Sequence, residues 1–210
     1  MNYEFANLTL DPKTTALLVI DVEYEFCDPS GRVFLGERVY PALRNLSRLQ
    51  ARCRELGVPI VFVRSVRDTD DLEFTSFGCQ PMLVRGTQAV EYMPEVAPQP
   101  GEPVVEKHSH DPFNGTQLVS VLDGLGIKPG AGHTVLTCGV ATHICVTCGV
   151  IGLSVRNYNA VLVADCSASA TLEQEELAYR LFSEHAYRYN VKLSTSNRLE
   201  FAKAPAPAGA

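Results

Sequence analysis

The stretch Ala16-Leu-Leu-Val-Ile-Asp21 is apolar at five consecutive positions and ends on an acid. A strand with one face in water alternates apolar and polar side chains, whereas a strand buried on both faces of a parallel sheet is apolar throughout. The stretch therefore predicts an interior strand of a parallel sheet, with Asp21 at its carboxyl end.

Further apolar runs follow along the chain, and segments of helical period separate them. In the first of these segments Leu43, Leu46 and Leu49 recur at a spacing of three, and Gly57 follows as a helix stop. The predicted strands cover residues 16–21, 59–65, 103–107, 134–138, 160–165 and 191–195. The predicted helices cover residues 37–56, 116–125, 142–155 and 172–189.

Alternating strands and helices predict an α/β fold, namely a three-layer, doubly wound and mostly parallel sheet of about six strands with helices on both faces. The 210 residues fit one domain, which we place at residues 1–203. Residues 204–210 are Ala, Pro and Gly only and are expected to be disordered. Residues 66–99 lack a sustained period and predict a lid or an interface.

Composition narrows the possible partners. The chain has 18 basic and 24 acidic side chains, with a net charge of −6 and no run of Lys or Arg. Nucleic acid and anionic membrane surfaces are therefore not expected as partners, and no apolar run is long enough for a membrane span. The seven cysteines form no regular framework and are expected to be reduced. We expect a cytoplasmic protein.

In open α/β sheets the ligand binds beyond the carboxyl ends of the strands. Asp21 and Lys107 end two predicted strands there, and Cys145 begins the helix that follows a third. A helix N-terminus and a nearby ammonium both favour a thiolate, so Cys145 is the predicted nucleophile. Asp21 is the predicted proton carrier, which takes the thiol proton and later returns it to the leaving amine. The N–H groups of Ala141 and Cys145 can form an oxyanion hole.

Three ordered motifs carry a resemblance that spans about residues 15–195. They are Leu17-Leu-Val-Ile-Asp-Val-Glu-Tyr-Glu-Phe26, Val105-Glu-Lys-His-Ser-His-Asp-Pro-Phe-Asn-Gly-Thr-Gln-Leu118 and Leu136-Thr-Cys-Gly-Val-Ala-Thr-His-Ile-Cys-Val146. The chain resembles the isochorismatase-like cysteine hydrolases, a family that includes nicotinamidases, biuret hydrolases, and ureidoacrylate and N-carbamoylsarcosine amidohydrolases.

The resemblance implies a catalytic triad of Asp21, Lys107 and Cys145 and a cis peptide bond between Val140 and Ala141. It also implies a homo-oligomer, a dimer or a tetramer. The predicted substrate pocket contains Phe26, Phe113, Thr142 and Glu23. Glu23 stands where the family often has Gln, and its role is left open.

Metal-binding nicotinamidases carry an Asp-x-His element after the second strand. The corresponding stretch here is Arg64-Ser-Val-Arg-Asp-Thr-Asp-Asp71, which has no histidine. We therefore predict no metal and no cofactor, although a weak site for a hard cation at Asp68, Asp70 and Asp71 stays open. Nicotinamide becomes a less favoured substrate.

The predicted function is a metal-independent cysteine amidohydrolase that cleaves a non-peptide C–N bond of a small amide, ureide or carbamoyl compound through a thioester. Isochorismatases proper lack the cysteine in the family pattern, so Cys145 favours C–N cleavage. A nicotinamidase-type amidase is one alternative. A second alternative is a redox protein that uses Cys145 and Cys148 as a C-x-x-C pair, and a third is a non-catalytic binding protein. His108 and His110 flank Lys107 and are interpreted as surface histidines with a small chance of touching substrate.

Overall fold

Parallel strands form the centre of the molecule in the computed structural model, which describes residues 3–183 and 190–202. Within these residues the main sheet has six strands in the order β4-β3-β2-β5-β6-β7, and all neighbours run parallel. The strands are β2 (Thr15–Ile20), β3 (Ile60–Ser65), β4 (Val104–Lys107), β5 (Gly130–Val140), β6 (Tyr158–Ala168) and β7 (Val191–Ser194). The predicted fold class is confirmed, and β5 and β6 are longer than predicted.

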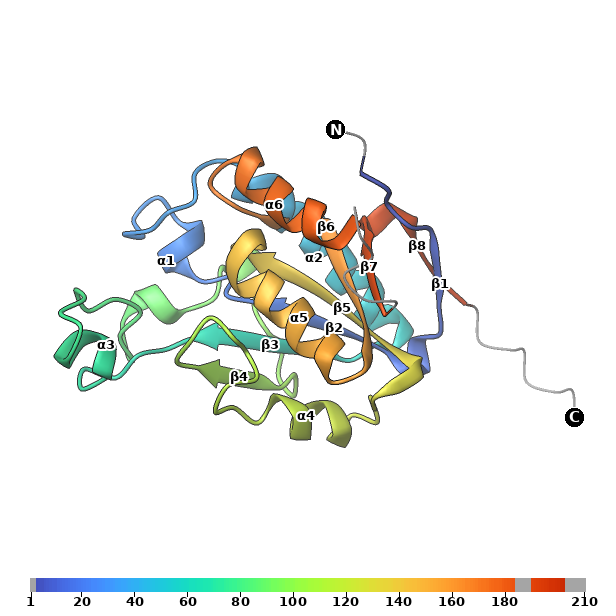
Figure 1. The fold of residues 1–210 in the computed structure, drawn as a ribbon, viewed down its shortest axis with the longest axis horizontal. Coiled ribbons are helices and arrows are strands. Elements are labelled where there is room, and N and C mark those ends of the chain that lie inside the picture. The colour runs from blue at the N-terminus through green and yellow to red at the C-terminus, as the bar shows by residue number, and fades with distance from the viewer. Residues whose placement is uncertain (1–2, 184–189, 203–210) are drawn as a thin grey trace, which may run out of the picture.

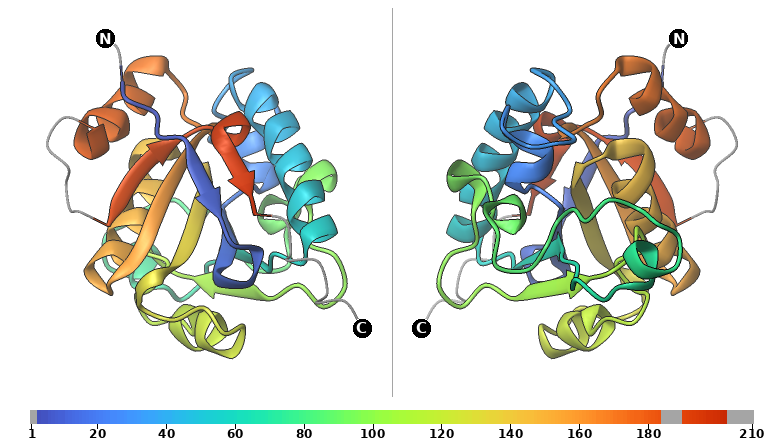
Figure 2. Two further views of the ribbon diagram at one scale, coloured as in Figure 1. Left: turned by 90° about the vertical axis from the view of Figure 1, so that its right-hand side faces the viewer. Right: turned by 90° about the vertical axis from the view of Figure 1, so that its left-hand side faces the viewer.

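Helices cover both faces of this sheet (Figures 1 and 2). The helix α2 (Val39–Leu56) packs on one face, and α4 (Leu118–Gly124), α5 (Thr147–Val155) and α6 (Leu172–Ser183) pack on the other. Alternate residues of β2 serve the two cores: Leu17 and Val19 face α2, whereas Leu18 and Ile20 face α4 and α5. This division explains the uninterrupted apolar run at residues 16–20.

The buried face of α6 differs from the prediction. The helical period of this segment rests on Leu177, Leu181 and Phe182 and predicts that they face the core, yet Leu177 and Leu181 are 56% and 39% exposed. Ala178, Tyr179 and Phe182 are buried in their place. Apolar side chains cover more of the surface of α6 than the helix buries. The spacing of its apolar residues therefore does not show which part of that surface faces the core. Residues 184–189, at the predicted end of the helix, lie outside the described residues.

Two short strands near the chain ends were not predicted. β1 (Leu8–Leu10) and β8 (Leu199–Phe201) pair in parallel as a separate sheet. The short helices are η1 (Pro12–Thr14), α1 (Tyr24–Cys27), α3 (Leu72–Thr75), η2 (Gln88–Val90), η3 (Pro94–Val96), η4 (Thr142–Val146) and η5 (Ser196–Arg198). The expected tail, 204–210, lies outside the described residues.

The segment 66–99 has two parts. Its first part carries α3, which lies beyond the carboxyl end of β3 (Figure 1). Its second part packs into the core beside α2 through Met93 and Val96, which are 7% and 1% exposed. Only the first part, around α3, therefore lies where it could act as a lid, and we call this part the lid.

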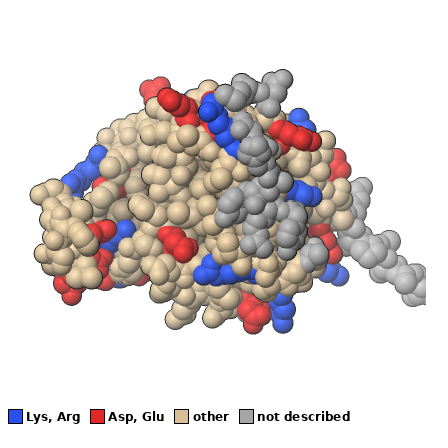
Figure 3. All heavy atoms as spheres, in the orientation of Figure 1, with Lys and Arg blue, Asp and Glu red and all other residues tan. Residues whose placement is uncertain are grey.

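The described residues contain no helix long and apolar enough to cross a membrane. On the face shown in Figure 3, acidic and basic side chains are interspersed and no large patch of one sign forms.

Candidate active site

Four neighbouring strands deliver polar side chains to one edge of the sheet. Lys107 ends β4 and is paired in register with Ser65, which ends β3. Asp21 follows β2, and Cys145 lies in η4, just after β5. The chain continues from β2 toward β3 and β4 on one side and from β5 toward β6 and β7 on the other. The crevice between β2 and β5 is thus the topological switch point, where α/β sheets bind ligands.

The end of β5 lies unusually close to β2. Gly139 has a φ of 118°, and a Cβ at this position would lie 2.0 Å from the carbonyl oxygen of Ile20. Only glycine permits this approach. The Val140–Ala141 peptide bond in the following turn is cis. The turn leads into η4, a π-helical turn that contains Cys145.

The ammonium of Lys107 lies at the centre of a buried cluster. Its Nζ is 2.8 Å from Asp21 Oδ2 and 3.5 Å from Cys145 Sγ. The structure therefore brings the three predicted catalytic side chains together. Asp21 and Lys107 are fully buried, and Cys145 is 7% exposed.

Ser65 is a member of this cluster that the sequence analysis missed. Its Oγ accepts a hydrogen bond of 2.7 Å from Lys107 Nζ and donates one of 3.1 Å to Asp21 Oδ1. The available signal was its place at the end of an apolar run between the strands that carry Asp21 and Lys107. Ser65 thus bridges the two charged groups.

The pKa values of Lys107 and Cys145 both lie above their ordinary values. Burial lowers the pKa of Lys107, but the negative charge of Asp21 and its hydrogen bond to the ammonium help to offset this, and the pKa is raised on balance. Burial and then the charge of Asp21 raise the pKa of Cys145, and Lys107 counters them only in part. This direction is the opposite of the one that the helix N-terminus and the ammonium favour, because burial outweighs both.

Glu23 does not lie in the substrate pocket. It is fully buried behind Asp21, and its Oε2 accepts a hydrogen bond of 3.2 Å from the backbone N–H of Ser65. Burial and the nearby charge of Asp21 hold its pKa well above the ordinary value for a glutamate. Glu23 therefore supports the cluster and does not contact a ligand in the cavity.

A cavity of about 570 Å³ opens above Cys145. Its walls come from the lid part of 66–99, the loops after β4 and β5, and the segment after α1. The lining residues are Phe26, Val33, Leu35, Ser65, Arg67, Glu73, Phe74, Cys79, Met82, Leu83, His108, Ser109, His110, Ala141, His143, Ile144, Cys145, Ala170 and Gln174. Most of this surface is apolar.

Phe26 lines the cavity as predicted, whereas Phe113 and Thr142 do not. Phe113 is 7% exposed and packs against the backbone of Gly152, where a Cβ would lie 2.4 Å from its ring. The guanidinium of Arg156 covers the ring at 4.3 Å. Thr142 is fully buried within the turn that begins η4. Both residues therefore support the fold of the site.

Three histidines line the cavity, and each has a different partner. Nδ1 of His110 is 3.4 Å from Cys145 Sγ, a contact that the surface interpretation missed. His143 contacts Ser169 Oγ at 2.9 Å, and His108 contacts Asp71 at 3.3 Å. The available signal for His110 was its place three residues after Lys107, on the same sheet edge.

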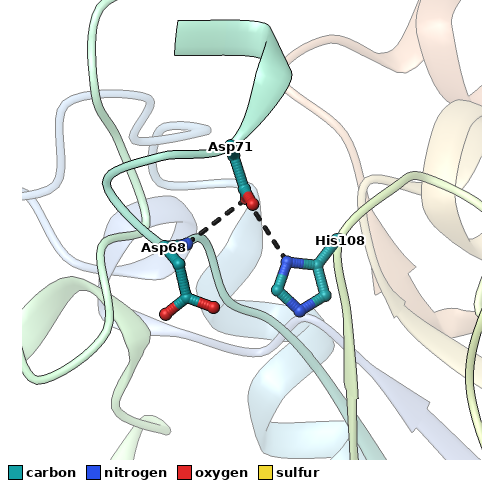
Figure 4. A group of neighbouring side chains, drawn as sticks. All are labelled: Asp68, Asp71 and His108. Atoms are coloured by element: carbon teal, nitrogen blue, oxygen red, sulfur yellow. Dashed lines mark hydrogen bonds and ion pairs between the residues drawn. The ribbon is translucent and has the colours of Figure 1, made fainter. Parts of the chain in front are cut away.

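Asp68, Asp71 and His108 form the one potential metal-binding group among the described residues, with one ligand atom of each within 4.8 Å of the others. The carboxylate of Asp71 lies between the backbone N–H of Asp68 and the imidazole of His108 (Figure 4). Asp68 is paired with Arg85 at 2.8 Å. This guanidinium already neutralises one carboxylate, so the group fits a cation poorly. Asp70, which the sequence analysis included, is not part of it.

Comparison with known proteins gives a consistent result. The model of the isochorismatase domain matches residues 15–195. An uncharacterised isochorismatase family protein of Bacillus subtilis, YddQ, is 28% identical over 163 residues, which cover 78% of this chain and 82% of that protein. An isochorismatase-like hydrolase from Alkaliphilus metalliredigens has 25% identity and a TM-score of 0.76, covering 88% of this chain and 96% of that one. The N-carbamoylsarcosine amidase of Thermoplasma acidophilum has 25% identity and a TM-score of 0.71, covering 88% and 97%.

Proposed function

This chain belongs to the isochorismatase family of hydrolases, and we propose that within it the protein is a cysteine amidohydrolase for a small amide, ureide or carbamoyl compound. The observation that carries the proposal is the position of Cys145. Its Sγ faces a cavity, while Lys107 lies 3.5 Å behind it and is paired with Asp21. The likeness to a protein named N-carbamoylsarcosine amidase adds support.

In this proposal Cys145 Sγ attacks the carbonyl carbon of the substrate and forms a thioester. Asp21 takes the thiol proton, and the ammonium of Lys107 stabilises the sulfur as its negative charge develops. A general base such as Asp21 suits a thiol whose pKa is raised by burial, because the base removes the proton as the sulfur attacks. The backbone N–H groups of Ala141 and Cys145 form the oxyanion hole. Every step uses side chains or backbone of this chain.

The cavity favours a substrate with an apolar part. Its walls include several large apolar side chains, namely Phe26, Leu35, Phe74, Met82, Leu83 and Ile144. Ser109 and Gln174 supply hydrogen-bonding groups beside them. A small carbonyl group held at Cys145, with an apolar substituent against the lid, fits both features.

The test is release of ammonia or amine from a panel of amides, ureides and carbamoyl compounds by the native protein, Cys145→Ala and Cys148→Ala. Cys148 is half-buried and lies outside the cavity lining. Hydrolysis by the native protein and Cys148→Ala, but not by Cys145→Ala, supports the proposal. Hydrolysis that needs both cysteines, or that survives in Cys145→Ala, contradicts it.

We also propose that the protein forms a homo-oligomer in the cytoplasm. Large apolar side chains are exposed on the lid and on α6, with Phe77 80%, Leu72 70% and Leu177 56% exposed. Such side chains are often covered in assemblies. Sedimentation equilibrium tests the assembly, and cell fractionation tests the location.

A further inference from the structure

His110 contacts the sulfur of Cys145 from the side of the cavity. The distance from its Nδ1 to Sγ is 3.4 Å. Asp21 and Lys107 are the other two partners of this sulfur, and both are fully buried and lie outside the cavity lining. Of the three partners of the thiol, only His110 therefore also faces the space in which a substrate would lie.

The loop after β4 holds His110 in this place. The carbonyl oxygen of Ser109 accepts a hydrogen bond of 2.9 Å from Lys107 Nζ. The Oγ of Ser109 donates to the carbonyl oxygen of Asp111 at 3.2 Å and accepts from Asn114 Nδ2 at 3.4 Å. These hydrogen bonds hold the loop around the ammonium of Lys107. The loop thereby places the imidazole of His110 in contact with the sulfur of Cys145. His108, two residues earlier, turns to Asp71 instead.

Cleavage of an amide requires a proton on the departing nitrogen, because an amide anion is a very poor leaving group. In the proposed function that nitrogen would lie in the cavity, whereas Asp21, which the sequence analysis assigns to this step, is fully buried and does not line the cavity. The imidazole of His110 lies at the cavity wall, and an imidazole can serve as both general acid and general base. We propose that His110 is a further catalytic residue, which protonates the leaving amine and then deprotonates the water that attacks the thioester.

The protons balance over one cycle. The S–C bond forms as the thiol proton moves to Asp21, and the C–N bond breaks as the His110 imidazolium protonates the nitrogen. Water then attacks the thioester and gives one proton to the neutral His110. The S–C bond breaks as Asp21 returns its proton to the sulfur. Both side chains end in their starting states, and the products are the acid and the amine.

The first test rests on the proposed function and compares an amide with the 4-nitrophenyl ester of the same acyl group. In His110→Gln we expect acylation by the amide to slow by about a hundredfold, the lower range of general acid catalysis. The burst of nitrophenolate should slow by no more than about tenfold, the loss expected from the lower reactivity of the sulfur alone, because this leaving group needs no proton. The acyl-enzyme should then accumulate and be visible by mass spectrometry. Equal losses for amide and ester would overturn the proposal.

The second test needs no substrate and follows alkylation of Cys145 by iodoacetamide between pH 5 and 9, with the label mapped by mass spectrometry. Transfer of the thiol proton to the neutral imidazole 3.4 Å away yields a small thiolate fraction that does not depend on pH, so the native rate should level off. In His110→Gln it should rise about tenfold per pH unit throughout and be about tenfold slower near pH 6. His108→Gln, the matched control, should level off as the native protein does.

The two tests separate the two proposals. A native protein that hydrolyses no amide but shows the levelling, lost only in His110→Gln, contradicts the proposed function and supports the pairing of His110 with Cys145. If His110→Gln is alkylated with the native pH profile, the role of His110 is refuted whatever the substrate is.

Discussion

The carboxyl group of Glu23 holds the backbone N–H of Ser65 at 3.2 Å, directly behind the candidate catalytic cluster. Ser65 in turn bridges Lys107 and Asp21. The other oxygen of Glu23, Oε1, is buried without a hydrogen-bond partner in the structure. A buried carboxyl group beside Asp21 is more stable neutral than ionised. Burial and the charge of Asp21 therefore favour the neutral form of Glu23, which has the shape of a glutamine.

We predict that Glu23→Gln keeps the hydrolytic activity and gains stability at neutral pH. The pKa of Glu23 is raised in the folded protein, so the folded state holds a proton that the unfolded state loses above about pH 4.5. Native stability then falls by up to about 1.4 kcal/mol per pH unit until the folded pKa is reached. In Glu23→Gln the stability should not fall with pH in this way, because the glutamine side chain does not ionise.

Urea unfolding of both proteins from pH 4 to 8 measures this difference. The groups facing Glu23 are Asp21, Lys107, Arg64, Tyr92 and Cys27. Because they are identical in the two proteins, the difference between the curves isolates Glu23. A difference that does not change with pH would show that Glu23 is ionised in the folded state.

We predict that Ser65→Ala lowers the free energy of unfolding by about 1.5–3 kcal/mol, the range for a hydrogen bond to a charged group. The reason is that Lys107 and Asp21 both lose a buried partner. The matched control is Ser154→Ala, a buried serine whose partner is the uncharged side chain of Asn190. It should cost about 0.5–1.5 kcal/mol. Equal losses in the two variants would argue against the bridging role.

We predict that Lys107→Met destabilises the protein by about 3–5 kcal/mol, since it leaves the Asp21 carboxylate buried without its cation. Adding Asp21→Asn should restore much of this stability without restoring activity. Thermal or urea unfolding of the two single variants and the double variant completes the cycle. Additive losses would mean that the two charges do not interact.

The main sheet was predictable because a strand buried on both faces has an uninterrupted run of apolar residues. The carboxyl ends of these runs in turn predicted the edge of the sheet at which the site lies. Asp21, Lys107 and Cys145 could be proposed because each lies at or just after the carboxyl end of such a strand. The pairing of β1 with β8 was not predictable, because three-residue strands at opposite chain ends carry too short a pattern.

The environment of each site residue was less predictable than its position. The burial that raises the pKa of Cys145 depends on elements from across the fold. His110 contacts Cys145 only because the loop after β4 folds back around Lys107. Phe113 was assigned to the pocket from its motif, but the absence of a side chain at Gly152 creates a space in the core that its ring fills. Such contacts join residues that are distant in sequence, so no local pattern reveals them.

The different positions of Phe26 and Phe113 lead to a prediction that separates binding from stability. Phe113→Ala should cost about 3–5 kcal/mol, because it removes a buried ring and leaves a cavity beside Gly152. Phe26→Ala removes a half-buried ring that lines the cavity, so it should cost less stability and raise KM roughly tenfold. Unfolding curves and steady-state kinetics on the same preparations provide both quantities. If Phe113→Ala instead raised KM with unchanged stability, the ring would belong to the substrate pocket, as its motif first suggested.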